Sequence, residues 1–254
     1  MSDQLSSRQS HARLRIPNEI ANLSTAPARN ELTRLRLLAR EADSDALGEG
    51  ACMRSVWQDV LKQRLSIATT FSDATRHYVV LREGAPVIAE PLSQRECDIL
   101  SRVLLGRTGK SIAQEIGLAG STVATYGTTG LRKLGMQCRE HAVPLALLMR
   151  VEYQLAAGRT TEYMMDGAIY VVVSVALSDF CLNSELTAAQ SRVLRLLLSG
   201  ASNADIAVDR RTCLHTAENQ VAAVFGKFSV SNRFRLLDPV LEAGQPVSAA
   251  LAVS

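Results

Sequence analysis

The sequence predicts a mostly α-helical protein in which one small helical unit occurs twice in tandem, each copy preceded by a short antiparallel β-hairpin. The first supporting observation is an internal repeat. Shifting the chain by 94 residues aligns two stretches without a gap, and the identities include Leu92/Leu186, Leu100/Leu194, Gly106/Gly200, Ile112/Ile206, Ala113/Ala207, Thr122/Thr216, Lys133/Lys227 and Arg139/Arg233. Self-similarity at one fixed offset indicates a duplication.

The second observation is a β-branched run ahead of each copy. Residues 78–80 (YVV) and 170–172 (YVV) are typical of strands, and a second short apolar stretch follows each, at 87–89 and 180–182. We expect each pair to form a hairpin. The offset here is 92 residues, so the two hairpin loops should differ in length by two residues.

The third observation is the pattern of helix starts and stops inside each copy. In the first copy Ser93 precedes an apolar periodic run, and Glu96 lies three residues later, as in a capping box. Ser121 or Thr122 is expected to cap the third helix. Glycines are expected to end the first three helices, at Gly106, Gly117 and Gly135. Three short helices with a tight turn before the third, followed by a fourth, describe a helix-turn-helix.

Prolines affect the fourth helix of both copies. Pro144 predicts that this helix is kinked or begins late in the first copy, and Asp238-Pro239 predicts an interruption in the second. Ahead of the first copy, residues 31–42 and 55–65 have the apolar spacing of two amphipathic helices, expected to pack against the hairpins. The predicted segments are a mobile tail (1–30), a helical region with the first hairpin (31–91), the first unit (92–158), a linker with the second hairpin (159–185), the second unit (186–241) and a C-terminal tail (242–254).

Composition and motifs argue against several functional classes. The five cysteines are scattered, with no C-x-x-C pair, which favours reduced thiols in a cytoplasmic protein over a zinc or disulfide framework. No phosphate-binding glycine loop, nucleophile elbow or metal-binding helix occurs, so we expect no enzyme, cofactor or metal. No apolar run is long enough to cross a membrane, and the N-terminal segment lacks the apolar core of a secretory signal.

Positive charge is concentrated in the two repeat windows. Residues 92–145 hold seven basic and four acidic side chains, and residues 186–237 hold seven and three. The formal net charge of the whole chain is only +3, so the rest of the chain is net acidic. This distribution is the one expected when the partner is a phosphate backbone.

These blocks resemble the LuxR-type DNA-binding domain, whose pattern runs approximately L-T-x-R-E-x-E-V-L, G-x-S-N-K-E-I-A, S-x-x-T-V-K-x-H and K-L-G-V-x-x-R. The first copy carries it at 92–96 (LSQRE), 106–113 (GRTGKSIA), 121–123 (STV) and 133–136 (KLGM). The second carries it at 186–187 (LT), 200–207 (GASNADIA), 216–217 (TA) and 227–230 (KFSV), followed by Arg233. The resemblance implies two tandem LuxR-type helix-turn-helix units.

Both copies depart from the family pattern. The basic residue that follows T-V on the third helix is replaced by Ala124 in the first copy and by Glu218 in the second. Gly127 and Gly130 lie inside the third helix of the first copy, each costing about 1 kcal/mol relative to alanine. The second copy has Ala189-Gln190 where the family has Arg-Glu. These departures leave open the alternative that the domains are degenerate and bind another protein.

The resemblance implies that the third helix of each copy enters the major groove of double-stranded DNA. The candidate base contacts are Ser121, Thr122, Thr125, Tyr126 and Thr128 in the first copy and Thr216, Glu218, Asn219 and Gln220 in the second. The candidate phosphate contacts are Lys110, Arg132, Lys133, Ser202, Asn203 and Lys227. Asn219 and Gln220 have the better chemistry for base recognition, because a carboxamide can bond adenine through two hydrogen bonds.

The sequence therefore predicts a bacterial, cytoplasmic, sequence-specific transcriptional regulator that is not an enzyme. The alternative is an interaction protein that pairs with another regulator or with an RNA polymerase subunit, and a relationship to region four of sigma factors is a weaker third interpretation. The two copies are expected to act as an internal pair, with a homodimer as the alternative. Because Asn219 and Gln220 are retained, the second copy is expected to bind DNA better than the first.

Overall fold

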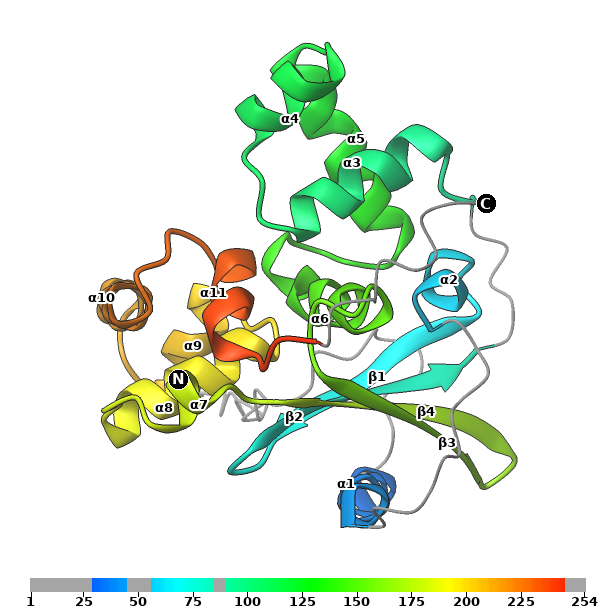
Figure 1. Cartoon of the computed structure of the whole chain (residues 1–254), viewed down its shortest axis with the longest axis vertical. Coiled ribbons are helices and arrows are strands. Elements are labelled where there is room, and N and C mark those ends of the chain that lie inside the picture. Colours follow the sequence, from blue (N-terminus) through cyan, green and yellow to red (C-terminus); the bar gives the residue numbers. More distant parts are fainter. Residues whose placement is uncertain (1–28, 45–55, 85–89, 245–254) are drawn as a thin grey trace, which may run out of the picture.

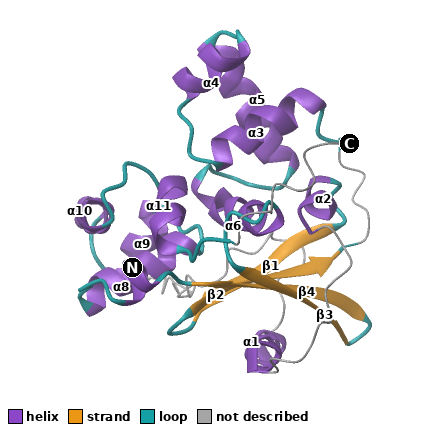
Figure 2. Ribbon diagram, in the orientation of Figure 1, coloured by secondary structure: helices purple, strands orange, loops and turns teal. Residues whose placement is uncertain are grey.

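The computed structural model describes residues 29–44, 56–84 and 90–244. A four-stranded antiparallel sheet forms the base of the molecule, with helices on both of its faces (Figures 1 and 2). Its strands are β1 (Leu65–Ser72), β2 (Arg76–Glu83), β3 (Gly158–Met165) and β4 (Ala168–Ala176). In the described ranges no helix is both long enough and apolar enough to cross a membrane.

The two hairpins join through their inner strands into one sheet of order β1-β2-β4-β3. In the antiparallel pairing of β2 with β4, Val80 lies opposite Val172, and Tyr78 lies opposite Ser174. Val172 follows Val80 by 92 residues, which is the sequence offset between the two hairpins. Each central strand therefore pairs with its own sequence equivalent, and a local two-fold axis passes between Val80 and Val172.

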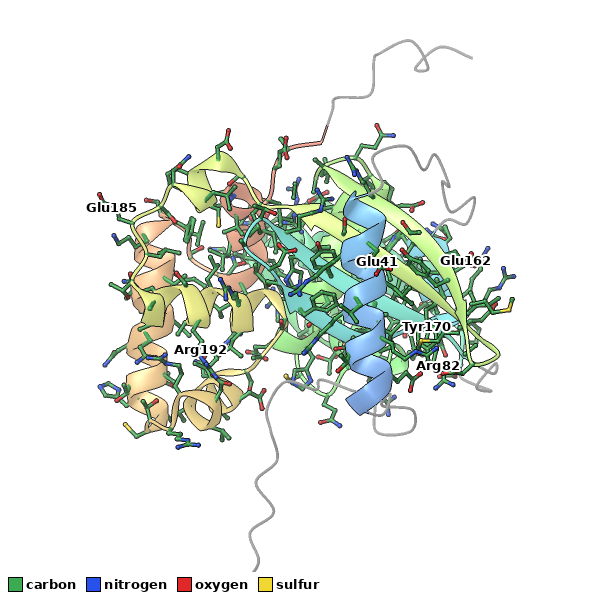
Figure 3. All side chains as sticks on the ribbon, turned by 90° about the horizontal axis from the view of Figure 1, so that it is seen from below. Glu41, Arg82, Glu162, Tyr170, Glu185 and Arg192 are labelled. Atoms are coloured by element: carbon green, nitrogen blue, oxygen red, sulfur yellow. The ribbon has the colours of Figure 1, made fainter. Side chains whose placement is uncertain are left out.

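Both faces of the sheet are covered. Helix α1 (Arg29–Ser44) lies across the outer face, where Leu35 packs with Tyr78 and Tyr170, as Figure 3 shows from that side. On the inner face, Val79 and Val171 pack in the main core with helix α2 (Val56–Leu61). Because successive strand side chains point to opposite faces, β4 is apolar at nearly every position.

The remaining helices form two groups on the inner side of the sheet (Figure 1). The first helical group contains α3 (Gln94–Leu104), α4 (Gly109–Ile116), α5 (Gly120–Lys133), the 3-10 turn η1 (Glu140–Ala142) and α6 (Val143–Glu152). The short helix α7 (Asp179–Leu182) precedes the second helical group, which contains α8 (Ala188–Leu198), α9 (Asn203–Arg210), α10 (Leu214–Lys227) and α11 (Arg233–Val240).

The first three helices of each group have equal lengths and begin 94 residues apart. Both α3 and α8 start with a capping box, at Ser93 and Thr187 respectively. The left-handed residues that end successive helices also recur at this offset, in the pairs Gly106/Gly200, Gly117/Arg211 and Gly135/Ser229. Only the first pair keeps glycine in both groups.

The two groups contact each other reciprocally around α6 and α11. A Cβ added at Gly106 would lie 3.0 Å from Cγ of Arg235, at the start of α11. A Cβ added at Gly200 would lie 3.0 Å from Cδ of Pro144, at the start of α6. The start of the last helix of each group therefore packs against the glycine turn of the other group, and their buried side chains belong to one core.

The second strand predicted for the second hairpin was wrong, and the one predicted for the first hairpin lies outside the described residues. Residues 180–182 lie in helix α7, and 87–89 lie outside the described residues. The true partners, β1 and β3, precede the β-branched runs instead of following them. Strand β3 was missed because it is an edge strand with mostly polar, partly exposed side chains (GRTTEYMM), which lack the apolar signal of a buried strand.

Several boundaries also differ from the sequence prediction. The helix expected over 55–65 ends at Leu61, because β1 begins at Leu65. The predicted tail 1–30 lies outside the described residues except for Arg29 and Asn30, which begin α1. At the other end, the Glu242 backbone bonds with Ala157 and Ala176, so that residue belongs to the fold, while 245–254 lie outside the described residues.

The two prolines behave differently. As predicted, α6 begins late, at Val143, with Pro144 in its first turn, where a missing N–H costs nothing. The expected interruption at Asp238-Pro239 is wrong, because α11 continues to Val240. Pro239 lies in the last turn of α11, near the end of the helix.

Candidate nucleic-acid interface

A buried ion pair joins the start of α3 to the end of α5. The Glu96 carboxylate accepts hydrogen bonds from its own N-cap, the Ser93 N–H (2.7 Å), and from Lys133 Nζ (3.0 Å). Burial alone would raise the pKa of Glu96, but these bonds from Ser93 and Lys133 lower it below its ordinary value. The carboxylate therefore stays charged and holds the end of α5 to the start of α3.

This arrangement occupies the ammonium groups expected to meet phosphates. Lys133 Nζ also donates to the Pro91 carbonyl (3.2 Å), and its side chain is only 13% exposed. At the equivalent place in the second group, Lys227 Nζ donates to the Glu185 carbonyl (3.0 Å). Both lysines thus hold the chain just ahead of α3 or α8.

The start of α5 differs from the sequence prediction. Gly117, in the left-handed conformation, ends α4, and Ala119 is the N-cap of α5 without a side-chain cap bond. Ser121 and Thr122 therefore lie in the first helical turn and do not cap it. In the second group the N-cap is Cys213, and the Thr216 hydroxyl lies 3.2 Å from the Cys213 sulfur.

The outer face of α5 carries most of the candidate contacts of the first group. The exposed residues are Ser121, Thr125, Thr128 and Arg132, and Lys110 is exposed on α4. Thr122 and Tyr126 are half-buried, and Tyr126 packs against the core. The Thr125 hydroxyl donates to the Ser121 carbonyl (3.0 Å), so its hydrogen is already used within the helix.

The two glycines inside α5 face α3. A Cβ at Gly127 would lie 3.9 Å from Ile99, and one at Gly130 would lie 3.5 Å from Leu92, both ordinary contact distances. The helix runs unbroken through both positions. The glycines therefore lie on the side of α5 that packs against α3, and the residues on the exposed side of the helix keep their helical positions.

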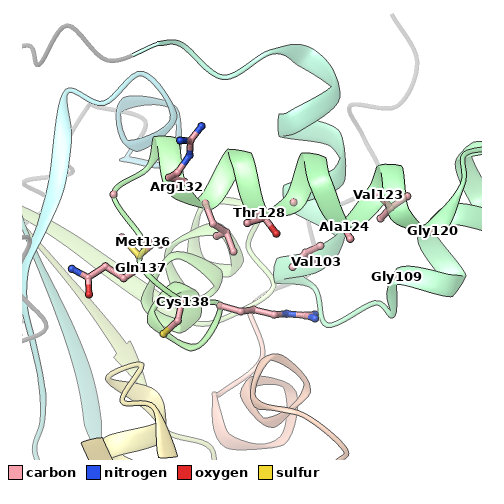
Figure 4. Close-up of a pocket in the computed structure, with 14 residues that line it drawn as sticks. Val103, Gly109, Gly120, Val123, Ala124, Thr128, Arg132, Met136, Gln137 and Cys138 are labelled. Atoms are coloured by element: carbon pink, nitrogen blue, oxygen red, sulfur yellow. The ribbon is translucent and has the colours of Figure 1, made fainter. Parts of the chain in front are cut away.

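A groove of about 500 Å³ runs along one side of α5, and residues 135–139 and the start of α4 also line it (Figure 4). Its walls include the apolar side chains of Val103, Val123 and Leu131. Ala124 and Thr128 lie along its edge on α5. Among the candidate contacts, only Thr128 and Arg132 line this groove.

In the second group the candidate residues on α10 differ in how far their side chains are exposed to solvent. Glu218 and Asn219 are exposed on α10, with Asn219 Nδ2 3.3 Å from His215 Nε2. Gln220 is half-buried, and its Oε1 atom has no hydrogen-bond partner among the described residues. The sequence ranked Asn219 and Gln220 alike, whereas the structure exposes only Asn219.

Ser202 and Asn203 have roles inside the fold. Ser202 is the N-cap of α9 and forms a capping box with Asp205. Asn203 Oδ1 accepts a hydrogen bond of 2.5 Å from Arg233 Nη2, and Arg233 also donates to the Ala201 carbonyl. Burial lowers the pKa of Arg233 from its ordinary value, with nearby acidic groups acting in the opposite direction.

Sequence reasoning missed a basic turn in the second group. Arg210 ends α9, and Arg211, in the left-handed conformation, leads toward α10 with its side chain exposed. Arg195 is exposed on α8. The sequence feature that could have predicted this basic turn is the pair of consecutive arginines at the end of the second helix of the repeat. The equivalent positions in the first group are Ile116 and Gly117, so comparing the copies by identity alone hid them.

The candidate residues thus form two separate clusters, on α4–α5 and on α9–α10. In the described part of the chain no group of histidine, cysteine and acidic side chains has the arrangement of a metal site. A family model described as "Bacterial regulatory proteins, luxR family" matches residues 90–146, the segment that contains α3, α4 and α5. Residues 90–146 are a LuxR-family helix-turn-helix domain.

Two curated relatives each match part of the chain. The HTH-type transcriptional activator RamA of Corynebacterium glutamicum is 44% identical over 55 residues, 22% of this chain and 20% of RamA. The probable transcriptional regulatory protein NarL of Mycobacterium tuberculosis is 37% identical over 71 residues, 28% of this chain and 33% of NarL. The chain spans a third or less of the length of these relatives. No solved structure matches the chain.

Proposed function

We propose that this protein is a bacterial cytoplasmic transcription regulator that binds double-stranded DNA through helix-turn-helix units. The observation that carries the proposal is the LuxR-family domain at 90–146, whose third helix, α5, exposes its outer face to solvent. Two similar proteins, RamA and NarL, are named as transcriptional regulators. An exposed recognition helix on a supported scaffold is the feature that major-groove binding requires.

In the first unit, Ser121, Thr125 and Thr128 are placed on the exposed face of α5, where side chains would meet base edges. Thr122 and Tyr126 would contribute less, because they are half-buried. Lys110 and Arg132 would bind phosphates. Lys133 would act indirectly, because its ammonium already pairs with Glu96.

We further propose that the second helical group is a second LuxR-type unit. Its support is the equal length of the three helices, their common offset of 94 residues and the capping box shared by α3 and α8. In this unit Asn219 would bond an adenine edge and Glu218 a cytosine amino group. Arg211 and Arg195 would bind phosphates, with Lys227 engaged at the Glu185 carbonyl.

The two units would act as a pair within one chain. Their contacts around α6 and α11 are reciprocal, and the sheet beneath them pairs each hairpin with its equivalent. A two-fold arrangement of this kind is how dimeric helix-turn-helix proteins address two half-sites about one helical turn apart.

A second candidate function is favoured by one specific observation. At the position of the third helix that directly follows T-V in the family pattern, neither unit has a basic residue: Ala124 stands there in the first unit and Glu218 in the second. Degenerate units of this kind would suit binding to another regulator or to an RNA polymerase subunit. Such an interaction protein would have no measurable affinity for duplex DNA.

A gel-shift titration on random-sequence duplex DNA at about 50 and 200 mM salt separates the two candidates. If about four phosphates are neutralised, the affinity should fall about 100-fold between these conditions, because each contact releases counterions. Arg64→Gln, on the sheet side of the molecule and paired with Asp59, is a control that should leave the affinity unchanged. Absence of a shift at the lower salt concentration would favour the interaction protein.

A further inference from the structure

One arginine is buried where the two helical groups meet. Arg150 lies in the last turn of α6, and the whole residue is 2% exposed. Its Nη1 atom donates to the carbonyls of Leu104 (3.0 Å) and Ala146 (3.1 Å). Its Nη2 atom donates to the Phe234 carbonyl (2.9 Å) and to Asp238 Oδ1 (2.9 Å).

These bonds connect three helices from both groups. Leu104 is the last residue of α3, the helix that supports α5, whereas Phe234 and Asp238 belong to α11. A guanidinium group is planar and directs its donors in fixed directions, so it accepts only a narrow range of positions for these partners. Sliding α11 along α6 by even one residue would remove Phe234 and Asp238 from reach together.

The other contacts between the groups are less restrictive. Gly106 against Arg235 and Gly200 against Pro144 are van der Waals contacts. The Asn232 side-chain amide also donates to the Gly106 carbonyl, but over a long distance of 3.5 Å and from a half-buried side chain. Arg139 lies over the Phe234 ring at 5.3 Å, an exposed contact that tolerates rotation. A buried guanidinium is different, because leaving any of its donors unpaired away from water is costly.

Arg150 also has no counterpart in the second group. Counted from the start of each helix, Arg150 in α6 corresponds to Val240 in α11. The hydrogen bonds of Arg150 therefore do not follow the local two-fold arrangement of the two groups. Its partners reach α3 of one group and α11 of the other, which is what a residue needs in order to set their relative position.

We infer that Arg150 is a positioning residue that fixes the two helix-turn-helix units in one relative placement, so that the chain accepts two DNA half-sites at one spacing only. This inference rests on the proposed DNA binding by both units. Adding one base pair between half-sites moves the second by about 3.4 Å and rotates it around the helix axis. A rigid pair cannot follow that displacement, whereas a loosened pair can.

The test compares spacing preference in the wild type, Arg150→Met and Asp238→Asn. Methionine fills a similar apolar space without a buried charge, and Asp238 is 48% exposed, so water can solvate it when the arginine is gone. Duplexes selected from a random pool by the wild-type chain supply the half-sites. Affinity is then measured by fluorescence anisotropy at the selected spacing, at spacings one and two base pairs longer, and for one half-site alone.

We expect the wild type to lose at least tenfold in affinity when the spacing changes, and Arg150→Met to lose less than threefold. Both should bind a single half-site equally well. Asp238→Asn keeps the three carbonyl bonds of Arg150, and the asparagine Oδ1 atom can still accept from the guanidinium group. This variant removes only the charge of the partner and should retain the wild-type spacing preference. Thermal melting by circular dichroism establishes that each variant is folded at the assay temperature.

The outcomes separate the inference from the proposed function. If the wild type binds no duplex, the proposed function fails. If it binds and Arg150→Met keeps the full spacing preference, DNA binding stands and the positioning role of Arg150 is wrong. Arg150→Lys provides a second folded variant, because it keeps the charge but loses the fork, and it should behave like Arg150→Met.

Discussion

At the scale of single residues, the two carboxamides near the start of α10 differ in what they can reach. Asn219 is exposed, whereas Gln220 is half-buried with its Oε1 atom unpaired among the described residues. In the first unit, the comparable exposed residue Thr125 already donates its hydroxyl hydrogen to Ser121. Asn219 Nδ2 lies 3.3 Å from His215 Nε2, but both residues are exposed, so this contact can be exchanged for one with a base. Asn219 therefore has the best combination of chemistry and exposure for base recognition.

Asn219→Ala should weaken binding to a selected duplex by about 1–3 kcal/mol, because a paired adenine contact is lost. Thr125→Ala should cost less, since its hydroxyl is engaged within the helix. Fluorescence anisotropy with the same duplex measures both. A loss from Thr125→Ala that equals or exceeds the loss from Asn219→Ala would reverse the ranking of the two units.

His77 is a second residue with a measurable consequence. It is fully buried in β2, with Nδ1 2.7 Å from the Ser72 hydroxyl, and burial lowers its pKa to about 4. The unfolded chain takes up this proton near pH 6.5. The contribution of neutral His77 to stability is therefore complete above pH 6.5 and is lost as the pH falls toward 4.

Urea unfolding between pH 7 and pH 5 should show a decrease in the unfolding free energy. The full decrease, about 3 kcal/mol, is reached once the pH is below about 4. His77→Leu removes the titrating group and should flatten the decrease between pH 6.5 and pH 5, where the ordinary carboxylates do not yet titrate. An identical pH dependence in the variant would mean that another group is responsible.

At the scale of elements, the ion pair between Glu96 and Lys133 distinguishes support from DNA contact. Lys133→Gln leaves the Glu96 carboxylate without its cationic partner and should lower the unfolding free energy. It should not change the salt dependence of DNA binding. Lys110→Gln, on the exposed start of α4, should reduce the salt slope by about one with little effect on stability.

Urea unfolding and anisotropy at several salt concentrations measure these two quantities for each variant. The prediction contrasts two lysines that the sequence treated alike as phosphate contacts. A reduced salt slope for Lys133→Gln, with stability unchanged, would mean that Lys133 contacts DNA phosphates and does not serve mainly to support the fold.

The helices of the first unit followed from the sequence, because their punctuation is local: Ser93 and Glu96 cap α3, and Gly106, Gly117 and Gly135 end helices where a left-handed residue is needed. Strand β3 did not follow, because its side chains are mostly polar and its pairing depends on β4, which comes later in the chain. Likewise, which lysines are free depends on Glu96 and the Glu185 carbonyl, each about 40 residues away. The spacing of residues along the sequence does not show which distant residues become partners in the folded chain.

At the scale of the whole molecule, the last helix of the first group, α6, has no apolar face left for a second chain. Residues 143–150 of α6 are all buried, against α2, α3, α8 and α11. A second chain would find no open face there. The DNA-free protein should therefore sediment as a monomer at micromolar concentration, and a stable dimer would contradict internal pairing as the sole mode.

The most direct test of the account is selection of duplexes from a random pool, followed by footprinting and determination of the number of chains bound. If one chain presents two recognition helices as a fixed pair, the selected duplexes should contain two half-sites about one helical turn apart, with one chain protecting both. Enrichment of a single half-site, or protection of two half-sites only by two chains, would contradict it.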